Sequence, residues 1–255
     1  MATRGPRVSF NVTVLGCSGV YQTPDLAASG FLIEIDGGHW LMDMGGGTWR
    51  NLLSHMDYRD LDGVFLSHRH PDHTIDIWQL FHARQYGDVD APATKIPLWA
   101  PQETIDRLVD FDDGVAESFA LMPVDETSEV KFGDARVAFA RMKHPPVTLG
   151  VRIEHGDATF AYTADTGPEG DIDAIAMGVD FFVCEATVQD ADEPWWGHLC
   201  ASDAARIAAH CGVDRLVLTH LRPERDRELS LEQARRAAPG LKVELATDGM
   251  KLEVG

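Results

Sequence analysis

The sequence predicts an α/β fold with four layers, an αββα sandwich in which two β-sheets face each other and helices cover the outer sides. Three observations support this prediction. Apolar or alternating segments typical of strands occur in both halves of the chain. Segments with helical spacing of apolar residues lie between them. Several neighbouring strands are close enough in sequence to form hairpins, which fits facing sheets.

The predicted strands are short apolar or alternating runs bounded by Gly, Pro or Asp, residues that commonly end strands. In chain order they are Val8–Leu15, Phe31–Ile35, Trp40–Met42, Val64–Leu66, Ile96–Trp99, Val137–Met142, Leu149–Ile153, Thr159–Tyr162, Phe181–Cys184, Leu216–Leu218 and Val243–Leu245. Strands are therefore expected on both sides of the sandwich.

The predicted helices are the segments in which apolar residues recur every three or four positions. They are Thr74–Tyr86, Gln102–Asp110, Asp171–Met177, Ser202–Cys211 and Leu231–Ala237. Ser202 and Ser230 stand where N-caps are expected, and Gly212 stands where a C-cap is expected. The acidic stretches Gly87–Thr94 and Asp112–Glu129 lack periodicity and are expected to be surface loops. Because β-rich and helical segments alternate twice, two similar halves are expected.

Composition limits the class of protein. The chain has 255 residues, of which 44% are hydrophobic, so we expect a single domain over residues 1–255 with a large core. Neither a signal peptide nor a run of roughly 18 apolar residues is found, which predicts a soluble cytoplasmic protein. Lys and Arg total 22 against 41 Asp and Glu, a formal charge of −19. Such a charge repels long nucleic acids unless a cationic patch or a metal offsets it.

The cysteines are few and scattered. They are Cys17, Cys184, Cys200 and Cys211. No CxxC pair occurs, so disulfides and a four-thiolate zinc site are not expected. Buried, reduced thiols are predicted instead.

The segment Ser67–His73 reads SHRHPDH and follows the apolar run Val64–Leu66. A strand ends here and a helix follows, so several polar side chains project from one turn: His68, His70, Asp72 and His73. A polar cap with solvated histidines would explain two of these residues but not all four. Neutral imidazoles and carboxylates bind zinc, and this set exceeds the needs of one ion. Two adjacent metals are therefore implied.

This segment matches HxHxDH, the signature of the metallo-β-lactamase superfamily, which the chain resembles. Further markers of the family occur in order: Asp43 in HWLMD, His144 in RMKHPP, Asp165 in AYTADTG and His220 in LVLTHL. The resemblance covers nearly the whole chain and implies the αββα fold of that family. It also implies two zinc ions. One would be bound by His68, His70 and His144, the other by Asp72, His73 and His220, with Asp165 bridging them and Asp43 just outside the ligand set.

The ligand types favour hydrolysis. Two ions about 3.5–4 Å apart can hold a bridging hydroxide that forms near neutral pH. Position 70 is histidine, where the oxygen-reducing diiron relatives carry glutamate, so redox chemistry is not expected. Asp165, in place of the cysteine or other ligand of antibiotic-hydrolysing relatives, argues against β-lactamase activity. Manganese or iron could replace zinc.

Longer stretches of the sequence indicate which branch of the superfamily the chain resembles. TVLGCSGVYQTPDLAASGFLIE, CEAT and GHLCASDAARIAAHCGVDRLVLTHL resemble ribonuclease Z and the short bacterial cyclic-nucleotide phosphodiesterases related to it. The resemblance implies that Glu185, in Glu185-Ala186-Thr187, orients His198, which protonates the leaving oxygen. The predicted catalytic residues are Asp72, Glu185 and His198. The alternative for His198 is that it only caps the helix starting near Ser202.

Other features bear on the substrate. Only twenty residues separate His144 from Asp165, too few for the tRNA-clasping arm that ribonuclease Z enzymes often carry there. Trp195 and Trp196 precede His198 and could form an aromatic wall for a nucleobase or serve only in packing. The glycines of Gly16–Gly19 and Gly45–Gly47 could approach a phosphate, although plain turns are favoured.

These features predict a dinuclear-zinc phosphodiesterase that acts on a small nucleotide, a cyclic nucleotide or a similar phosphodiester. The alternatives are a ribonuclease Z-like RNA endonuclease without the arm, and a lactonase or other acyl hydrolase. A non-catalytic nucleic-acid-binding scaffold is not expected, because every ligand position is filled. The expected partner is a small-molecule phosphodiester rather than long nucleic acid or a membrane. The resemblance also implies a homodimer.

Overall fold

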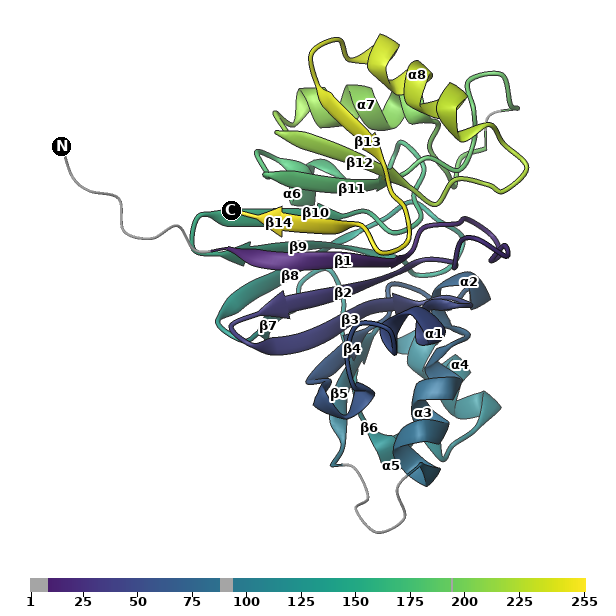
Figure 1. Cartoon of the computed structure of the whole chain (residues 1–255), viewed down its shortest axis with the longest axis vertical. Coiled ribbons are helices and arrows are strands. Elements are labelled where there is room, and N and C mark those ends of the chain that lie inside the picture. The colour runs from purple at the N-terminus through teal and green to yellow at the C-terminus, as the bar shows by residue number, and fades with distance from the viewer. Residues whose placement is uncertain (1–8, 88–93, 194) are drawn as a thin grey trace, which may run out of the picture.

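Two seven-stranded sheets face each other in the computed structural model, which describes residues 9–87, 94–193 and 195–255 (Figure 1). The first sheet has the strand order β14-β1-β2-β3-β4-β5-β6. Its strands are β1 (Phe10–Gly16), β2 (Gly30–Ile35), β3 (Gly38–Met44), β4 (Gly63–Phe65), β5 (Ile96–Ala100), β6 (Phe119–Pro123) and β14 (Lys251–Val254). Strands β14 to β3 pair antiparallel, whereas β3 to β6 pair parallel, so the sheet is mixed.

The second sheet has the order β13-β12-β11-β10-β9-β8-β7. Its strands are β7 (Glu129–Phe132), β8 (Ala135–Arg141), β9 (Leu149–His155), β10 (Ala158–Tyr162), β11 (Phe181–Glu185), β12 (Arg215–Thr219) and β13 (Lys242–Leu245). It is also mixed, because β7 to β10 pair antiparallel and β10 to β13 pair parallel. The predicted pair of similar halves therefore corresponds to two sheets of the same size and type.

Helices cover the outer side of each sheet (Figure 1). Those on the first sheet are α1 (Thr48–Leu52), α2 (Pro71–Thr74), α3 (Ile77–Tyr86), α4 (Gln102–Phe111) and α5 (Val115–Ser118), with the short 3₁₀ helix η1 (Tyr58–Asp60). Those on the second are α6 (Asp173–Ala176), α7 (Ala201–His210) and α8 (Arg227–Ala237). The predicted αββα sandwich is confirmed.

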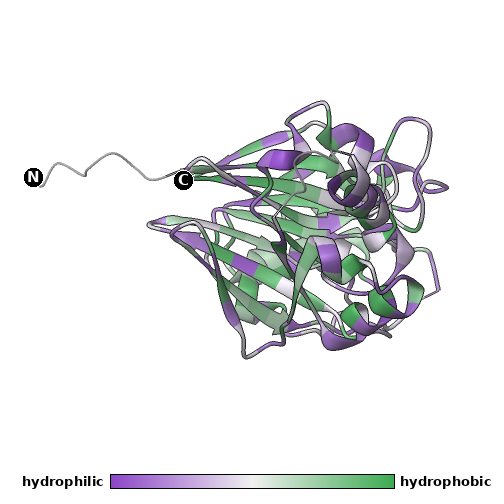
Figure 2. Cartoon of the chain, turned by 90° about the horizontal axis from the view of Figure 1, so that it is seen from below, coloured by the Kyte–Doolittle hydropathy of each residue, from purple (hydrophilic) through white to green (hydrophobic). Residues whose placement is uncertain are grey.

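Alternation along the strands explains the layers. In β2, Phe31 and Ile33 belong to the core between the sheets, whereas Leu32 faces the core under α3 and α4. In β11, Val183 points between the sheets and Phe182 points under α7 and α8. Successive strand residues face opposite sides, so a strand buried on both sides needs a continuous apolar run. Figure 2 shows the hydrophobic colour concentrated on the strands of the facing sheets.

The predicted helix Thr74–Tyr86 is wrong as a single element. It consists of the end of α2 and all of α3, separated at Ile75 and Asp76. The backbone N–H of Asp76 donates to Met44 O over 2.9 Å, and its carboxylate accepts from Trp49 N. Contacts with a neighbouring turn therefore interrupt the helix, and the local spacing of apolar residues does not reveal them.

Both predicted serine N-caps are wrong. Helix α7 begins one residue earlier, after Cys200, and Ser202 Oγ donates to Asp190 Oδ2 over 2.7 Å. Helix α8 is capped by Asp226, which accepts from the N–H groups of the second and third helical residues. Ser230 lies inside that helix. The C-cap of α7 is Cys211 rather than the predicted Gly212, which is the next residue and has a left-handed φ of 67°, the conformation in which glycine commonly ends a helix.

The predicted surface loop Asp112–Glu129 is also wrong, because it contains α5 and β6 and ends on the first residue of β7. Strand β6 is a half-exposed edge strand, so it lacks the continuous apolar run of a buried strand. The predicted loop Gly87–Thr94 lies almost entirely outside the described residues. The predicted helix Asp171–Met177 is shorter than expected, since α6 covers only Asp173–Ala176.

The thiol prediction is confirmed. All four cysteines are free, with Cys17, Cys184 and Cys211 buried and Cys200 half-buried. Burial raises the pKa of the Cys17 thiol to about 12, so it stays protonated near neutral pH. Within the described ranges, the structure contains no helix long and apolar enough to cross a membrane.

Candidate metal centre

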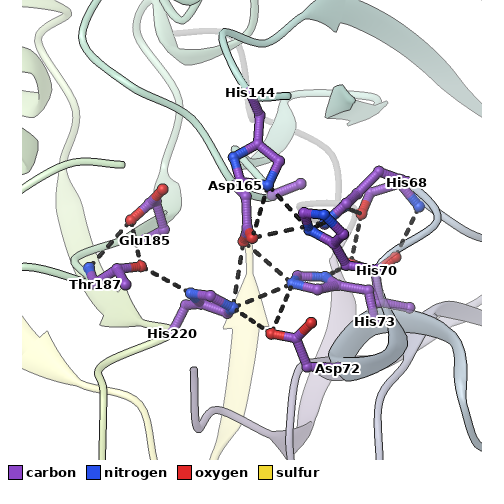
Figure 3. A network of polar contacts seen from close by, with 12 residues as sticks. His68, His70, Asp72, His73, His144, Asp165, Glu185, Thr187 and His220 are labelled. Carbon is purple, nitrogen blue, oxygen red and sulfur yellow. Dashed lines mark hydrogen bonds and ion pairs between the residues drawn. The ribbon is translucent and has the colours of Figure 1, made fainter. Parts of the chain in front are cut away.

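The predicted ligands meet at one edge of the sandwich, where loops leave strands of both sheets (Figure 3). His68 to His73 lie between β4 and the end of α2 in the first sheet's half. The others follow strands of the second sheet: His144 after β8, Asp165 after β10 and His220 after β12. Because neighbouring parallel strands end at the same edge, residues far apart in sequence come together there.

One group of potential ligands consists of His68, His70, His144 and Asp165. His70 Nδ1 lies 3.1 Å from both His68 Nε2 and His144 Nε2. Asp165 Oδ2 lies 3.6 Å from His68 Nε2 and 3.5 Å from His144 Nε2. Three ring nitrogens and one carboxylate oxygen therefore converge on a common point.

A second group consists of Asp72, His73 and His220. His220 Nε2 lies 3.2 Å from both His73 Nε2 and Asp72 Oδ2. The other oxygen of Asp165, Oδ1, lies 3.1 Å from His73 Nε2 and 3.4 Å from His220 Nε2. Asp165 thus turns one oxygen to each group, which is the arrangement expected of a bridging carboxylate.

Hydrogen bonds outside the cluster determine which ring nitrogen carries a proton. His144 Nδ1 lies 2.9 Å from the carbonyl oxygen of Gly197, and His73 Nδ1 lies 2.8 Å from Asp43 Oδ2. Both partners can only accept, so each Nδ1 must be the donor. The Nε2 atom of each neutral ring then carries a lone pair, and that atom faces the cluster.

The same argument applies to His68 and His220 through a hydroxyl relay. Ser67 Oγ donates to Asp43 Oδ2 over 2.8 Å and therefore accepts from His68 Nδ1 at 3.0 Å. Thr187 Oγ1 donates to Glu185 Oε2 over 2.7 Å and therefore accepts from His220 Nδ1 at 2.8 Å. Four Nε2 lone pairs consequently point into the cluster.

This arrangement fits metal ions. The rings of His73 and His220 face each other with their Nε2 atoms 3.2 Å apart. Asp165 Oδ1 is buried and accepts no hydrogen bond from the described residues. A cation at each group would satisfy these atoms, as borderline ions such as zinc do. Without a metal, a proton on His73 would take that place, because the charges of Asp165 and Asp43 outweigh burial and raise its pKa well above the ordinary value.

Burial keeps the other rings neutral, as metal ligands must be. Burial lowers the pKa of His144 to about 4 and that of His68 well below its ordinary value. Both rings therefore retain their lone pairs at pH 7 without a metal. Neutral imidazole is the form of histidine that coordinates zinc.

Glu185 and His198 lie beside this cluster as a second unit. His198 Nδ1 is 2.7 Å from Glu185 Oε1, and Glu185 is fully buried. Burial lowers the pKa of His198, but the charge of Glu185 and the hydrogen bond to it outweigh burial and raise the pKa to about 9. His198 thus carries a proton at neutral pH. The alternative that His198 caps α7 is wrong, because Cys200 occupies the N-cap and no side chain caps that end.

The structure places two sequence features whose role the sequence left open, the tryptophan pair and the glycine turn Gly45–Gly47. Trp195 lines a pocket together with His198, whereas Trp196 lies outside that lining, with Lys143 over its ring. A Cβ on Gly45 would lie 2.0 Å from the backbone oxygen of Asp72, so this glycine permits close packing of two turns. That contact agrees with the plain turn favoured for Gly45–Gly47.

Several supporting groups were not predicted. Tyr162 OH donates to Asp43 Oδ2 over 2.9 Å, and the backbone N–H of Val20 donates to Asp72 Oδ2 over 2.9 Å. Ser67 lies directly before His68 in the motif, so its position could have indicated a supporting role. The Val20 N–H and the Gly197 carbonyl are backbone groups, and no sequence signal marks them.

Two facing mixed sheets with this His/Asp cluster at one edge define a metallo-hydrolase of the αββα class. The chain belongs to the beta-lactamase superfamily, because the family model described as "Beta-lactamase superfamily domain" matches residues 45–221. This match includes every predicted ligand and confirms the family that the HxHxDH motif indicates.

Relatives support the same branch. The uncharacterized protein Rv1339 of Mycobacterium tuberculosis (strain ATCC 25618 / H37Rv) is 35% identical over 246 residues, covering 91% of this chain and 88% of that protein. Ribonuclease Z of Methanopyrus kandleri is 26% identical over 283 residues, covering 94% of this chain and 96% of that protein. The predicted resemblance to the ribonuclease Z branch is therefore confirmed.

Solved structures share the fold. The metallo-β-lactamase fold protein YhfI from Bacillus subtilis superposes with a TM-score of 0.87 at 26% identity, covering 96% of this chain and 99% of that chain. A diphosphatase from the PhnP family superposes with a TM-score of 0.75 at 20% identity, covering 96% and 97% of the two chains. The latter likeness bears on the fold alone.

Proposed function

We propose that this chain is a two-metal phosphodiesterase whose substrate is a small nucleotide, cyclic or linear, or a similar small phosphodiester. The observation that carries the proposal is the protonated His198, held by the buried Glu185 next to the ligand cluster. An alkoxide leaving a phosphorus atom needs a proton, and His198 can supply it. The ribonuclease Z relatives, whose name denotes a nuclease, support phosphodiester chemistry.

In this proposal the ligands divide as the sequence predicts. His68, His70 and His144 would hold one ion, Asp72, His73 and His220 would hold the other, and Asp165 would be shared by both groups. Zinc is the proposed metal because imidazole nitrogens dominate both groups. When bound, such ions supply Lewis-acid chemistry: they activate water near neutral pH and withdraw charge from the group under attack.

The protein's own residues do the remaining work. Glu185 keeps His198 protonated through Nδ1, so the other ring nitrogen, Nε2, is the atom that donates to the leaving oxygen. Asp72 is proposed to orient the attacking water, since its side chain is 12% exposed whereas that of Asp165 is 3% exposed. The Val20 N–H holds Asp72 Oδ2 in place.

Two features favour a small substrate. His144 and Asp165 are joined through the hairpin of β9 and β10, in which Val151–His155 pairs with Ala158–Tyr162, so no arm projects there. The formal charge of −19 disfavours polyanions. The ribonuclease Z relatives nevertheless make RNA cleavage the second candidate function. The homodimer that the resemblance implies and the cytoplasmic location that the sequence indicates stay predictions.

The test compares leaving groups. We expect the zinc-loaded protein to hydrolyse both bis(p-nitrophenyl) phosphate and a 3′,5′-cyclic nucleotide. His198→Ala should lower turnover of the cyclic nucleotide about 10²–10⁴-fold, because general acid catalysis contributes that much for a poor leaving group. Turnover of the nitrophenyl ester should fall far less, since p-nitrophenolate leaves without a proton. Steady-state kinetics on both substrates measure the difference.

His210→Ala is the matched control, because His210 is an exposed histidine on α7 that contacts only the exposed Asp173. Should protein with about two metals per chain leave every phosphodiester intact, the proposal is wrong. Hydrolysis of lactones or thioesters that survives His198→Ala would instead identify an acyl hydrolase. Cleavage of a precursor tRNA in preference to small phosphodiesters would identify the ribonuclease Z-like alternative.

A further inference from the structure

A pocket of about 600 Å³ opens beside His198, and we call it the Trp195 pocket. Its lining includes Val20, Thr187, Trp195 and His198, together with two arginines, Arg222 and Arg225, and two acidic residues, Asp192 and Glu193. A volume of this size is within the range of pockets that hold small ligands. Nothing in the proposed chemistry at the metal centre uses this space.

Three residues that line the Trp195 pocket also contact the candidate metal centre. Val20 donates its backbone N–H to Asp72, and Thr187 Oγ1 forms a hydrogen bond of 2.8 Å with His220 Nδ1. His198 itself lines the pocket and lies within 4.8 Å of ligand atoms of Asp165 and His220. A substrate held at the metals therefore extends into this pocket on the side of its leaving oxygen, because His198 is the group that protonates that oxygen.

The guanidinium of Arg222 lies in this pocket without a hydrogen-bonded partner. Arg222 is half-buried, and its side chain forms no hydrogen bond or ion pair with any residue that the structure describes, although the charges of Asp192 and Glu224 act on it at longer range. Its neighbour Arg225, in contrast, is held by both carboxylate oxygens of Asp192. Arg222 is two residues beyond His220, so their Cα atoms are at most about 7 Å apart. In a chain of charge −19, an unpaired arginine this close to the metals is suited to bind an anion.

Trp195 supplies a flat apolar wall. Its ring centroid lies 4.8 Å from that of His198 and 5.9 Å from that of His144, so one part of the indole is fixed by the site. The side chain is nevertheless 40% exposed and lines the pocket. Exposed aromatic rings of this kind stack on nucleobases.

We propose that the Trp195 pocket binds the leaving nucleoside of the substrate, with its base on Trp195 and its terminal phosphate paired with Arg222. The preferred substrate is then a short linear nucleotide that ends in a 5′-phosphate. Water adds to the bridging phosphorus, the bond from phosphorus to O3′ breaks, and O3′ takes the proton of His198 Nε2. The departing product is a nucleoside 5′-monophosphate with a free 3′-hydroxyl. This inference rests on the proposed phosphodiesterase function and specifies its substrate.

The experiment compares two dinucleotides, pApA and ApA, which differ only in the 5′-phosphate of the leaving nucleoside. We expect the zinc-loaded protein to show a higher kcat/KM for pApA. Arg222→Gln should lower kcat/KM for pApA about tenfold or more, as expected for a hydrogen bond between charged groups, and leave ApA nearly unchanged. Arg222→Lys should restore part of the preference. Arg206→Gln is the control, because it removes the same charge from the exposed surface of α7.

Trp195→Ala should lower kcat/KM for both dinucleotides, whereas Trp196→Ala, at a ring outside the pocket lining, should lower it less. Binding of both dinucleotides is also measured at equilibrium in the metal-loaded His198→Ala variant, with and without Arg222→Gln. Tighter binding of pApA that depends on Arg222 supports the inference. Equal losses for pApA and ApA overturn it, since Arg222 would then act on the scissile phosphate. If neither dinucleotide nor bis(p-nitrophenyl) phosphate is hydrolysed, the proposed function fails, and the binding comparison still decides the role of the pocket.

Discussion

Asp43 lies fully buried in β3 and holds three side chains around the candidate metal centre. Its Oδ1 accepts from Ser67 N over 2.7 Å, and its Oδ2 accepts from Ser67 Oγ, His73 Nδ1 and Tyr162 OH over 2.8, 2.8 and 2.9 Å. Because every partner is a donor, this position requires a carboxylate. The proton on His73 Nδ1, and with it the lone pair on Nε2, depends on this requirement.

Replacing Asp43 by Asn should therefore weaken metal binding. The amide places an NH₂ group among donors, so His73 loses its acceptor and can turn the wrong nitrogen toward the metal. We expect metal affinity to fall about 10–100-fold, the usual effect of losing a group that orients a ligand. Competition with a chromophoric chelator measures the affinity. Tyr162→Phe is the control, because it removes one donor and keeps the bond to His73; an equal loss in both variants would contradict the argument.

Among single residues, the sequence predicts those whose side chains belong to a recognisable motif. Asp165 and His220 could be assigned from the sequence because the family that the chain resembles carries its remaining ligands at strand ends, in a fixed order after HxHxDH. The groups that orient them could not be placed in the same way. The carbonyl of Gly197 and the N–H of Val20 act through the backbone, and their positions result from how distant loops pack. Val20 adopts a left-handed φ of 68°, which a β-branched residue rarely does, so its residue type gives no hint.

At the scale of elements, the turn after β3 determines where α2 lies. Gly45 packs against the backbone of Asp72, and a Cβ there would lie 2.0 Å from its carbonyl oxygen. Gly45 is held in place because its N–H donates to Ser29 O, so a side chain there would push against α2, which contains Asp72 and His73. The position of two proposed ligands, Asp72 and His73, thus depends on the absence of a side chain at residue 45.

We expect Gly45→Ala to displace α2 and to impair the second ligand group. A misplacement of about 1 Å at a reacting centre can lower turnover about 10²-fold. The measurements are bound metal per chain and kcat on a phosphodiester. Gly46→Ala is a matched control in the same turn, since the close contact of a Cβ there is with the end of the flexible Gln22 side chain, and Ile75 Cγ2 lies at an ordinary contact distance of 3.4 Å. Similar losses in both variants would mean that the contact with Asp72 does not matter.

Elements were predictable where both faces of a strand are buried. Strands such as β2 and β11 carry continuous apolar runs because each face packs on a core. Strands at or near a sheet edge lack this signal: β6, β7 and β14 are short and partly exposed. Helix α1 was missed for a similar reason, since it has only five residues. Sequence periodicity therefore reports burial first and hydrogen-bonded structure only indirectly.

At the scale of the whole molecule, the fold does not depend on the metal centre. One hydrophobic core lies between the sheets, and two more lie between each sheet and its helices. The proposed ligands lie in the short helix α2 and in segments that follow strands β4, β8, β10 and β12, and their side chains point toward one another (Figure 3). Strand pairing and the hydrophobic cores account for the order of the layers, and the segments that carry the proposed ligands lie outside these cores.

Removal of metal should consequently lower thermal stability without unfolding the protein. Ions that bind only the folded state at about 1,000 times their dissociation constant stabilise it by about 4 kcal/mol, which corresponds to a fall in Tm on the order of 10 °C on chelation. Far-UV circular dichroism at 25 °C should stay unchanged, because the three cores remain. Asp165→Ala removes the carboxylate shared by both groups. This variant should have the lowered Tm without any chelator, and adding chelator should not change its Tm further. Loss of the circular dichroism signal on chelation would mean instead that the metals hold the sandwich together.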